Sequence, residues 1–365
     1  MRLRNVRTVL ATVTAGLAAA TCLTAAGPAN AQESHACSPS VSIAGFSDAL
    51  DKTTYEGTFV GNFSALAVDR NGDLAALSDR SSLFALNGRT LQPEGVVQLA
   101  DESGAALDAE GLVVDLPHSR LLPHARLRSR GGTPMSGGTP IGTYLVSSET
   151  EPSVRRYSRD GRILDRLPVP DALRVAPAGR AVGNGTFEGL TMLPGGRTLI
   201  ASMEYALSGD SAGVVRLQTW KRHHGSFALG AQYAYRADTG LGVPEVTATP
   251  DGRLLVLERG FTAGVGNTVR LYLADPRRAT DTSGIENLTG QDGVRLIKKT
   301  LLADIADCPD LGATAKQPQP NPLLDNIEAM TITGHRNGRL NVLLASDDNQ
   351  NAVQTTRFYS LRVRT

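Results

Sequence analysis

A strand–turn–strand pattern recurs five times along this chain of 365 residues. Each copy has an apolar strand opened by a small or acidic residue, a turn, and a second apolar strand that ends in serine or an acid. The copies lie at residues 63–80, 109–149, 187–204, 244–259 and 326–349. In four copies the turn is Asn-Gly, Asp-Gly or Gly-Gly, which favours a tight hairpin because such turns need positive φ angles. The repeat therefore predicts five β-hairpins.

Three of the hairpins are followed by another pair of strand-like runs. These pairs are residues 154–157 with 163–167, 214–220 with 226–235, and 269–273 with 294–302. A hairpin plus a pair gives four strands, which is the content of one propeller blade. We predict an all-β fold, a β-propeller with five recognisable hairpin repeats and five to seven blades. A β-sandwich is the alternative, but it does not require one hairpin signature five times.

The N-terminal residues 1–31 have the pattern of a secretory signal peptide. Three arginines precede an uncharged apolar run at residues 9–26, and Ala29-Asn30-Ala31 is a small-residue cleavage motif. We expect cleavage after Ala31 and secretion; an uncleaved anchor and a lipoprotein attached at Cys22 are the alternatives. Residues 32–56 are expected to form an N-terminal arm, and residues 57–365 a single propeller. The arm is expected to be part of a closing blade, in which its residues 41–49 pair with residues 358–363.

The mature chain is nearly neutral. Removing residues 1–31 removes three arginines and no acids, so the formal charge changes from +1 to −2. Nothing in this balance favours binding to nucleic acid or insertion into a membrane. We expect a monomer that acts on a small molecule.

Two cysteines remain after processing, Cys37 and Cys308. In an oxidising compartment an isolated pair most simply forms one disulfide. The bond would join the N-terminal arm to a late element of the chain. Two separate thiols are the alternative.

Acidic residues recur at two places in the repeat. At the start of the first strand, one equivalent position holds Ser64, Glu110, Glu188, Glu245 and Glu328. The ends of the second strands hold Asp79, Glu149, Glu204, Glu258 and Asp347, the last followed by Asp348 and Asn349. In an antiparallel hairpin the start of one strand lies beside the end of its partner. In a propeller the first strand of every blade lines a central channel. We therefore expect both sets at the same end of this channel.

Carboxylates so close together raise one another's pKa unless cations compensate. Ca²⁺ is one natural partner, because it accepts several carboxylate oxygens in a loose geometry. Arg80 and Arg259, each directly after a second-strand acid, are the other candidates. The alternative is that each acid makes a structural hydrogen bond inside its own blade.

Three other features have less specific interpretations. Residues 209–213 match the G-x-S-x-G nucleophile motif around Ser211, but a strand-like run follows where a hydrolase has a helix. We interpret this segment as a turn. Two insertions, residues 117–143 and 307–325, are predicted loops that either rim the acidic site or are variable surface segments.

The chain resembles the phytase-like family, described as having esterase-like activity of phytase. The matching segments are residues 76–80, 187–190, 255–259, 326–330 and 345–349, and the resemblance extends from about residue 57 to the C-terminus. The resemblance implies an extracellular or periplasmic propeller hydrolase. Through the related β-propeller phytases it also implies calcium ions that clamp phosphate groups and activate water.

These observations predict a secreted hydrolase of ester or phosphoester bonds that uses Ca²⁺. The expected metal ligands are Glu110, Glu188, Glu245, Glu328 and Asp347. The expected catalytic groups are Glu188, Glu328, Arg80 and Arg259. The surrounding shell is expected to contain Asp79, Glu149, Glu204, Glu258, Asp348 and Asn349. The competing hypothesis is a non-catalytic ligand-binding or scaffold propeller whose acids are structural.

Overall fold

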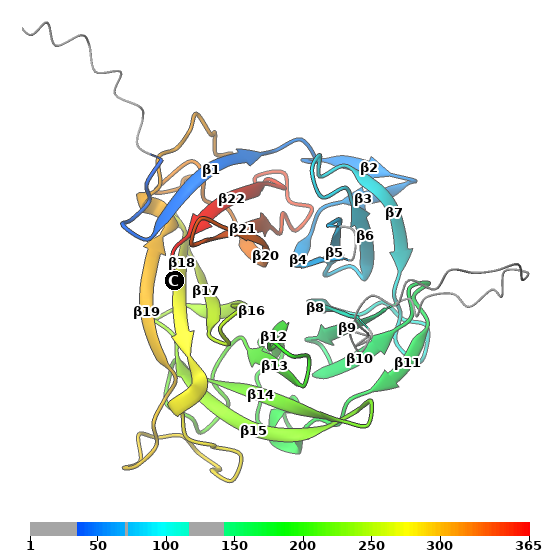
Figure 1. Cartoon of the computed structure of the whole chain (residues 1–365), viewed down its shortest axis with the longest axis vertical. Helices are drawn as coiled ribbons and strands as arrows, with labels where there is room; N and C mark the ends of the chain where they lie inside the picture. The colour runs from blue at the N-terminus through cyan, green and yellow to red at the C-terminus, as the bar shows by residue number, and fades with distance from the viewer. Residues whose placement is uncertain (1–34, 70–71, 117–141) are drawn as a thin grey trace, which may run out of the picture. The chain divides into compact units, whose positions relative to one another are not determined.

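Each predicted hairpin forms the inner half of a four-stranded antiparallel sheet. The computed structural model describes residues 35–69, 72–116 and 142–365, and residues 35–365 form one compact unit. Within these residues five such sheets are arranged around a common centre (Figure 1). The protein is therefore a five-bladed β-propeller, which confirms the predicted fold class.

The first four blades each consist of four strands consecutive in sequence. Blade 1 contains β4 (Phe63–Val68), β5 (Leu74–Ser78), β6 (Ser82–Leu86) and β7 (Pro93–Gln98). Blade 2 contains β8 (Ala109–Asp115), β9 (Thr143–Ser148), β10 (Ser153–Tyr157) and β11 (Ile163–Arg166). Blade 3 contains β12 (Phe187–Met192), β13 (Thr198–Met203), β14 (Val214–His223) and β15 (Ser226–Arg236). Blade 4 contains β16 (Gly242–Ala248), β17 (Leu254–Thr262), β18 (Gly266–Asp275) and β19 (Lys298–Asp304).

The fifth blade joins the two ends of the domain, as expected. Its inner strands are β20 (Ile327–Arg336), β21 (Arg339–Ser346) and β22 (Phe358–Val363), and β1 (Val41–Ser47) is its outermost strand. The register pairs Val41 with Val363 and Ser47 with Phe358. This pairing closes the ring with backbone hydrogen bonds from both ends of the chain.

Short elements occupy the connections. A small hairpin, β2 (Thr53–Tyr55) and β3 (Thr58–Val60), links the closing blade to blade 1. Three single-turn 3₁₀ helices are η1 (Asp171–Leu173), η2 (Pro276–Arg278) and η3 (Ile305–Asp307). At the β20–β21 turn, Asn337 and Gly338 have φ angles of 52° and 71°, the conformation that an Asn-Gly turn predicts.

The hydrophobic core consists of layers between neighbouring blades. One cluster packs Phe187 and Trp220 of blade 3 against Val113 and Leu145 of blade 2. Similar clusters lie between each of the other adjacent pairs of blades. Alternating strand residues supply both faces of each sheet, which explains why the inner strands have nearly continuous apolar runs.

The predicted disulfide between Cys37 and Cys308 is present, with a sequence separation of 271 residues. It joins the segment before β1 to the segment after η3, and both sulfurs lie in the core cluster between blades 4 and 5. Within the described part of the chain, no helix is long and apolar enough to cross a bilayer. The predicted signal peptide and most of the 117–143 insertion lie outside the described residues.

Candidate functional site

A repeated backbone hydrogen bond fixes the acidic end of four blades. The N–H of the acid that follows the second strand donates to the carbonyl of the residue two positions before the first-strand acid or serine. These bonds join Asp79 to Asn62 (3.0 Å), Glu149 to Asp108 (3.0 Å), Glu204 to Thr186 (2.8 Å) and Asp347 to Asn326 (2.8 Å). They hold the two acidic positions of each hairpin side by side, as the antiparallel pairing predicts.

A β-bulge turns the first-strand residue toward the channel in the same four blades. In blade 5, Ile327 pairs with Ser346 and Ala329 with Ala345, so Glu328 is an extra residue in the ladder. The same irregularity occurs at Ser64, Glu110 and Glu188. Bulges commonly redirect one side chain next to a functional site. Here they direct three glutamates and a serine into one space.

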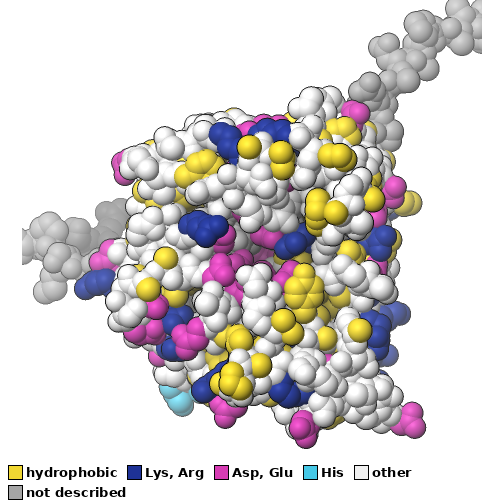
Figure 2. Space-filling view, turned by 180° about the vertical axis from the view of Figure 1, so that it is seen from behind, with side chains coloured by type: hydrophobic (Ala, Val, Ile, Leu, Met, Phe, Trp, Pro, Cys, Tyr) yellow, Lys and Arg dark blue, Asp and Glu magenta, His cyan; other side chains and the backbone are white. Residues whose placement is uncertain are grey.

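That space is a cavity of about 440 Å³. Eight of its lining residues are acids: Asp79, Asp108, Glu110, Glu149, Glu188, Glu204, Glu328 and Asp347. Among the described residues that line it, Arg259 is the only cation. Figure 2 shows acidic side chains gathered in a hollow at the centre of one face. The cavity therefore has a large excess of negative groups.

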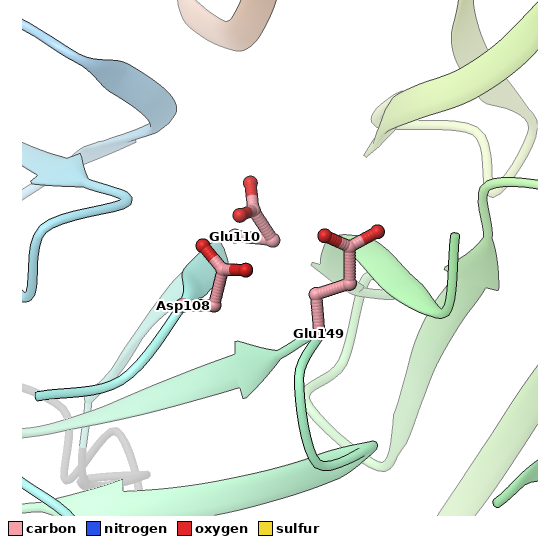
Figure 3. A group of neighbouring side chains, drawn as sticks. All are labelled: Asp108, Glu110 and Glu149. Carbon is pink, nitrogen blue, oxygen red and sulfur yellow. The ribbon is translucent and has the colours of Figure 1, made fainter. Parts of the chain in front are cut away.

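Two sets of carboxylates in this cavity are close enough to hold a cation. One set is Asp108, Glu110 and Glu149, whose carboxyl groups face one another in Figure 3; the other is Glu149, Glu188 and Glu204. Within each set, one oxygen per residue lies within 4.8 Å of the others. Because Glu149 belongs to both, the two positions are adjacent.

Burial makes the ionised form of these acids costly. It raises the pKa of Asp79 to about 6 and that of Glu204 to about 7, with Arg259 opposing the shift at Glu204. Burial raises the pKa of Glu110 and Glu188 well above the ordinary range, and neighbouring carboxylates add to the effect. Such groups favour either a proton or a bound cation.

Arg259 compensates part of this charge. Its Nη2 donates to Oε1 of Glu328 at 2.5 Å and to Oε1 of Glu204 at 3.5 Å. Burial still raises the pKa of Glu328, although Arg259 acts in the opposite direction. A single guanidinium cannot balance the negative charge of eight ionised carboxyl groups.

Two predicted site residues of blade 4 lie elsewhere, because the bulge in this blade is displaced. Gly242 pairs with Arg259 and Glu245 with Leu257, so the extra residue precedes Glu245. Glu245 accepts a hydrogen bond from the N–H of Val246 at 2.8 Å and does not line the cavity. Burial raises its pKa, while N–H groups of Val246, Leu190 and Met330 oppose the shift. The structure thus gives Glu245 a role in joining inner strands of three blades.

Glu258 points away from the cavity because it lies inside β17 rather than after it. It accepts hydrogen bonds from Tyr235 (2.5 Å), Lys299 (2.5 Å) and the N–H of Asp238 (2.7 Å). Side chains alternate between the two faces of a strand. Arg259, the next residue, therefore occupies the channel face where the other blades present an acid.

Two further predicted residues do not line the cavity. The Arg80 side chain is 64% exposed and approaches Asp79 at 3.6 Å. Asp348 is buried, pairs with Lys52 and accepts the N–H of Asn62 at 3.1 Å. Asn349, in contrast, lines the cavity together with the predicted acids.

The structure adds residues that the repeat did not identify. Asp108 and Asn326 line the cavity from the position two residues before the first-strand acid. Asn326 donates to Glu328 at 3.1 Å and to Asp347 at 3.3 Å. This position is polar in four copies of the repeat, so the sequence could have identified it as part of the site; the residues are Asn62, Asp108, Thr186 and Asn326.

The remaining sequence features are placed as follows. Gln317 lines the cavity, so the insertion at residues 307–325 forms part of its rim. The 117–143 insertion departs from the paired residues Asp115 and Thr143, at the opposite end of β8 and β9 from Glu110. Ser211 precedes strand β14, which agrees with the interpretation of this segment as a turn.

Comparisons with solved structures give only distant matches. Three solved structures are similar: Myxococcus xanthus glutaminyl cyclase (12% identity, 89% of this chain and 96% of that chain, TM-score 0.41), a Xanthomonas campestris gluconolactonase (13%, 84% and 73%, 0.37) and a chain of the mitotic checkpoint complex (11%, 55% and 47%, 0.32). The match thus spans about half the length of the last of these. Likeness at this level does not indicate a shared activity. No protein with a curated description matches the chain.

A family comparison is more specific. Residues 58–350 match the phytase-like family, described as "Esterase-like activity of phytase". This range contains both carboxylate sets and Arg259. The chain therefore belongs to the phytase-like family.

Proposed function

We propose that the protein is an exported hydrolase that binds Ca²⁺ in the acidic cavity and cleaves ester or phosphoester bonds. The observation that carries the proposal is the convergence of eight buried or half-buried acids on one cavity with a single arginine. Family membership supports the hydrolase class. Export is supported by the N-terminal sequence pattern and by the disulfide.

The residues present fit a hard divalent cation. All the candidate ligands are carboxylate oxygens, which Ca²⁺ prefers. In the lining, the buried Oγ of Ser64 has no hydrogen-bond partner, and the buried Oδ1 of Asp79 has only the ion-pair contact with Arg80 at 3.6 Å. We assign Asp108, Glu110 and Glu149 to one cation position and Glu149, Glu188 and Glu204 to the other.

When bound, two adjacent ions would polarise the reacting group and lower the pKa of a coordinated water. The protein's own residues would orient the substrate and move protons. Burial raises the pKa of Glu328, which makes its carboxylate more basic and suits it to accept a proton. Arg259, beside Glu328, would contact an anionic oxygen of the substrate.

Two glutamates that the sequence repeat aligns, Glu188 and Glu245, provide a matched test. Glu188→Gln removes a carboxylate from the cavity, whereas Glu245→Gln removes one outside it. Purified protein would be assayed on p-nitrophenyl phosphate, p-nitrophenyl acetate and phytate, with Ca²⁺ or with chelator. We expect turnover that depends on Ca²⁺. Glu188→Gln should lower the turnover rate at least about a hundredfold, the order of magnitude for removing a preorganised charged group. Glu245→Gln should retain most of the activity.

Other results would change the assignment. Absence of turnover on all three substrates, with a melting temperature unchanged by chelator, would contradict both the hydrolase and the calcium proposals and favour a scaffold propeller. Activity lost in Ser211→Ala and retained in Glu188→Gln would indicate a serine esterase instead. Mass spectrometry of the exported protein tests the leader: we expect an N-terminus at Gln32 and a monomeric mass.

A further inference from the structure

The displaced register of blade 4 gives the cavity a second, chemically different wall. Arg259 and Phe261 lie two residues apart on β17, and Asn267 on β18 pairs directly with Phe261. Residues two apart on a strand, and residues directly opposite on neighbouring strands, present their side chains on the same face. All three side chains line the cavity, consistent with this pattern.

Two hydrogen-bond donors of this wall are buried and lack an acceptor. They are Nε of Arg259 and Nδ2 of Asn267, whose residue is only 2% exposed. The other arginine contacts use Nη2, toward Glu328 and Glu204. A buried N–H without an acceptor is unfavourable, so the wall is complementary to a ligand that supplies oxygen. Since both groups are donors, an oxyanion satisfies them best.

The segment that carries Asn267 is held in place by the second insertion. The Asn267 N–H donates to Oε1 of Gln319 at 2.7 Å. Gly266, with a φ angle of 112°, packs so closely on Pro318 and Gln319 that an added Cβ would lie 2.6 Å and 2.4 Å from their oxygens. The donors therefore project from a supported hairpin rather than from a free loop.

Two aromatic side chains flank the donors. Tyr205 is 40% exposed and Phe261 55% exposed, and both line the cavity. The Tyr205 ring fits between two glycines: an added Cβ would lie 2.7 Å from its Cδ2 at Gly185 and 2.9 Å from its Cε1 at Gly242. Exposed aromatic rings beside a charged pocket favour a ligand with an apolar part.

We propose that blade 4 forms the subsite for the anionic group of the substrate, an inference that rests on the proposed hydrolase function. Arg259 and Asn267 donate to the oxygens of a phosphate or carboxylate, and Phe261 and Tyr205 contact an apolar group attached to it. The eight acids cannot perform this role, because they repel an anion until cations are bound. The favoured substrate class is thus a phosphate monoester with an apolar substituent.

Calorimetric titration of inorganic phosphate, phenyl phosphate and benzoate into Ca²⁺-loaded protein tests this assignment. We expect phenyl phosphate to bind more tightly than phosphate; a preference for benzoate over both assigns the subsite to carboxylates. Asn267→Ala should weaken the preferred anion about tenfold, the typical effect of losing one charge-assisted hydrogen bond. Phe261→Ala should remove only the advantage of phenyl phosphate over phosphate.

Two controls match these variants outside the cavity. Asn341→Ala on β21 and the half-exposed Leu229→Ala on β15 should leave all three affinities unchanged. Anion binding that is identical in wild type and Asn267→Ala, or no anion binding by protein that still binds calcium, overturns the subsite and leaves the calcium proposal standing. Anion binding that depends on Asn267 in a protein that binds no calcium would support the subsite and contradict the calcium proposal.

Discussion

Arg259 of blade 4 donates a hydrogen bond to Glu328 of blade 5, with 2.5 Å between Nη2 and Oε1. The pair crosses the boundary between two blades and lies on the wall of the acidic cavity. Arg259 is the only cation among the described lining residues, and it also approaches Glu204. Loss of this pair, and the uncompensated charge of the other cavity acids, should both change the stability of the protein in the absence of calcium.

Replacing Arg259 should destabilise the protein without added calcium. Arg259→Met leaves Glu328 and Glu204 without their cation, and breaking a buried pair in this way costs about 3–5 kcal/mol. Urea unfolding at pH 7 in chelator measures the loss. Arg80→Met is the matched control, because Arg80 also follows a second-strand acid but is largely exposed; its change should stay within about 0.5 kcal/mol. Equal effects of the two substitutions would contradict the assigned compensation.

Stability without calcium should decrease as the pH rises from 5 to 8. Burial raises the pKa of Asp79 to about 6 and that of Glu204 to about 7, above the values near 4 in an unfolded chain. Between these limits the folded state binds more protons, so the free energy of unfolding falls through the folded pKa values. Each full excess proton contributes about 1.4 kcal/mol per pH unit.

Melting temperatures in chelator and in Ca²⁺ at pH 5, 6, 7 and 8 check this dependence. Calcium binds the ionised carboxylates, so its stabilising effect should be larger at pH 8 than at pH 5. A melting temperature in chelator that rises over this range would show that the cavity acids do not carry the predicted protons.

Breaking the Lys299–Glu258 pair should affect the fold but not the cavity. Glu258 is fully buried and faces Lys299, Tyr235 and Asp238 on the side of blade 4 away from the channel. We expect Lys299→Met to lower the free energy of unfolding by about 3 kcal/mol, with calcium affinity unchanged. Lys298→Met, an exposed neighbour on β19, is the control. Loss of calcium binding in Lys299→Met would place Glu258 in the metal site after all.

The disulfide should stabilise ring closure. A Cys37→Ser/Cys308→Ser double variant releases a loop of 271 residues, and we expect a loss of about 3–5 kcal/mol in chemical denaturation. A reducing agent should lower the melting temperature of the wild type and leave that of the variant unchanged. A reductant effect of the same size in both proteins would show that it does not act through this bond.

The repeat in the sequence was sufficient to predict the propeller and the convergence of most acids. Glycine turns and apolar strands are local signals, and antiparallel pairing then places Glu188 beside Glu204. The positions of Glu245 and Glu258 were not predictable in the same way. A bulge displaced in one blade reverses which side chains face the channel, and a shift of one position in the ladder moves each side chain to the other face.

The blade 4 wall was missed for a related reason. Asn267, Phe261 and Tyr205 are ordinary residues of strands and turns in the sequence, and only the register of β17 and β18 brings the first two beside Arg259. Asp108 could have been predicted from the sequence, because small polar residues recur two positions before the first-strand acid or serine in four blades.

Calcium titration of chelator-treated protein, followed by calorimetry, is the decisive test of whether the acidic cavity binds two ions. Because Glu149 belongs to both carboxylate sets, we expect the wild type to bind two ions, Glu149→Gln to bind neither, and Glu245→Gln to bind both. An absence of calcium binding by the wild type, or equal binding in Glu149→Gln and wild type, would contradict this expectation.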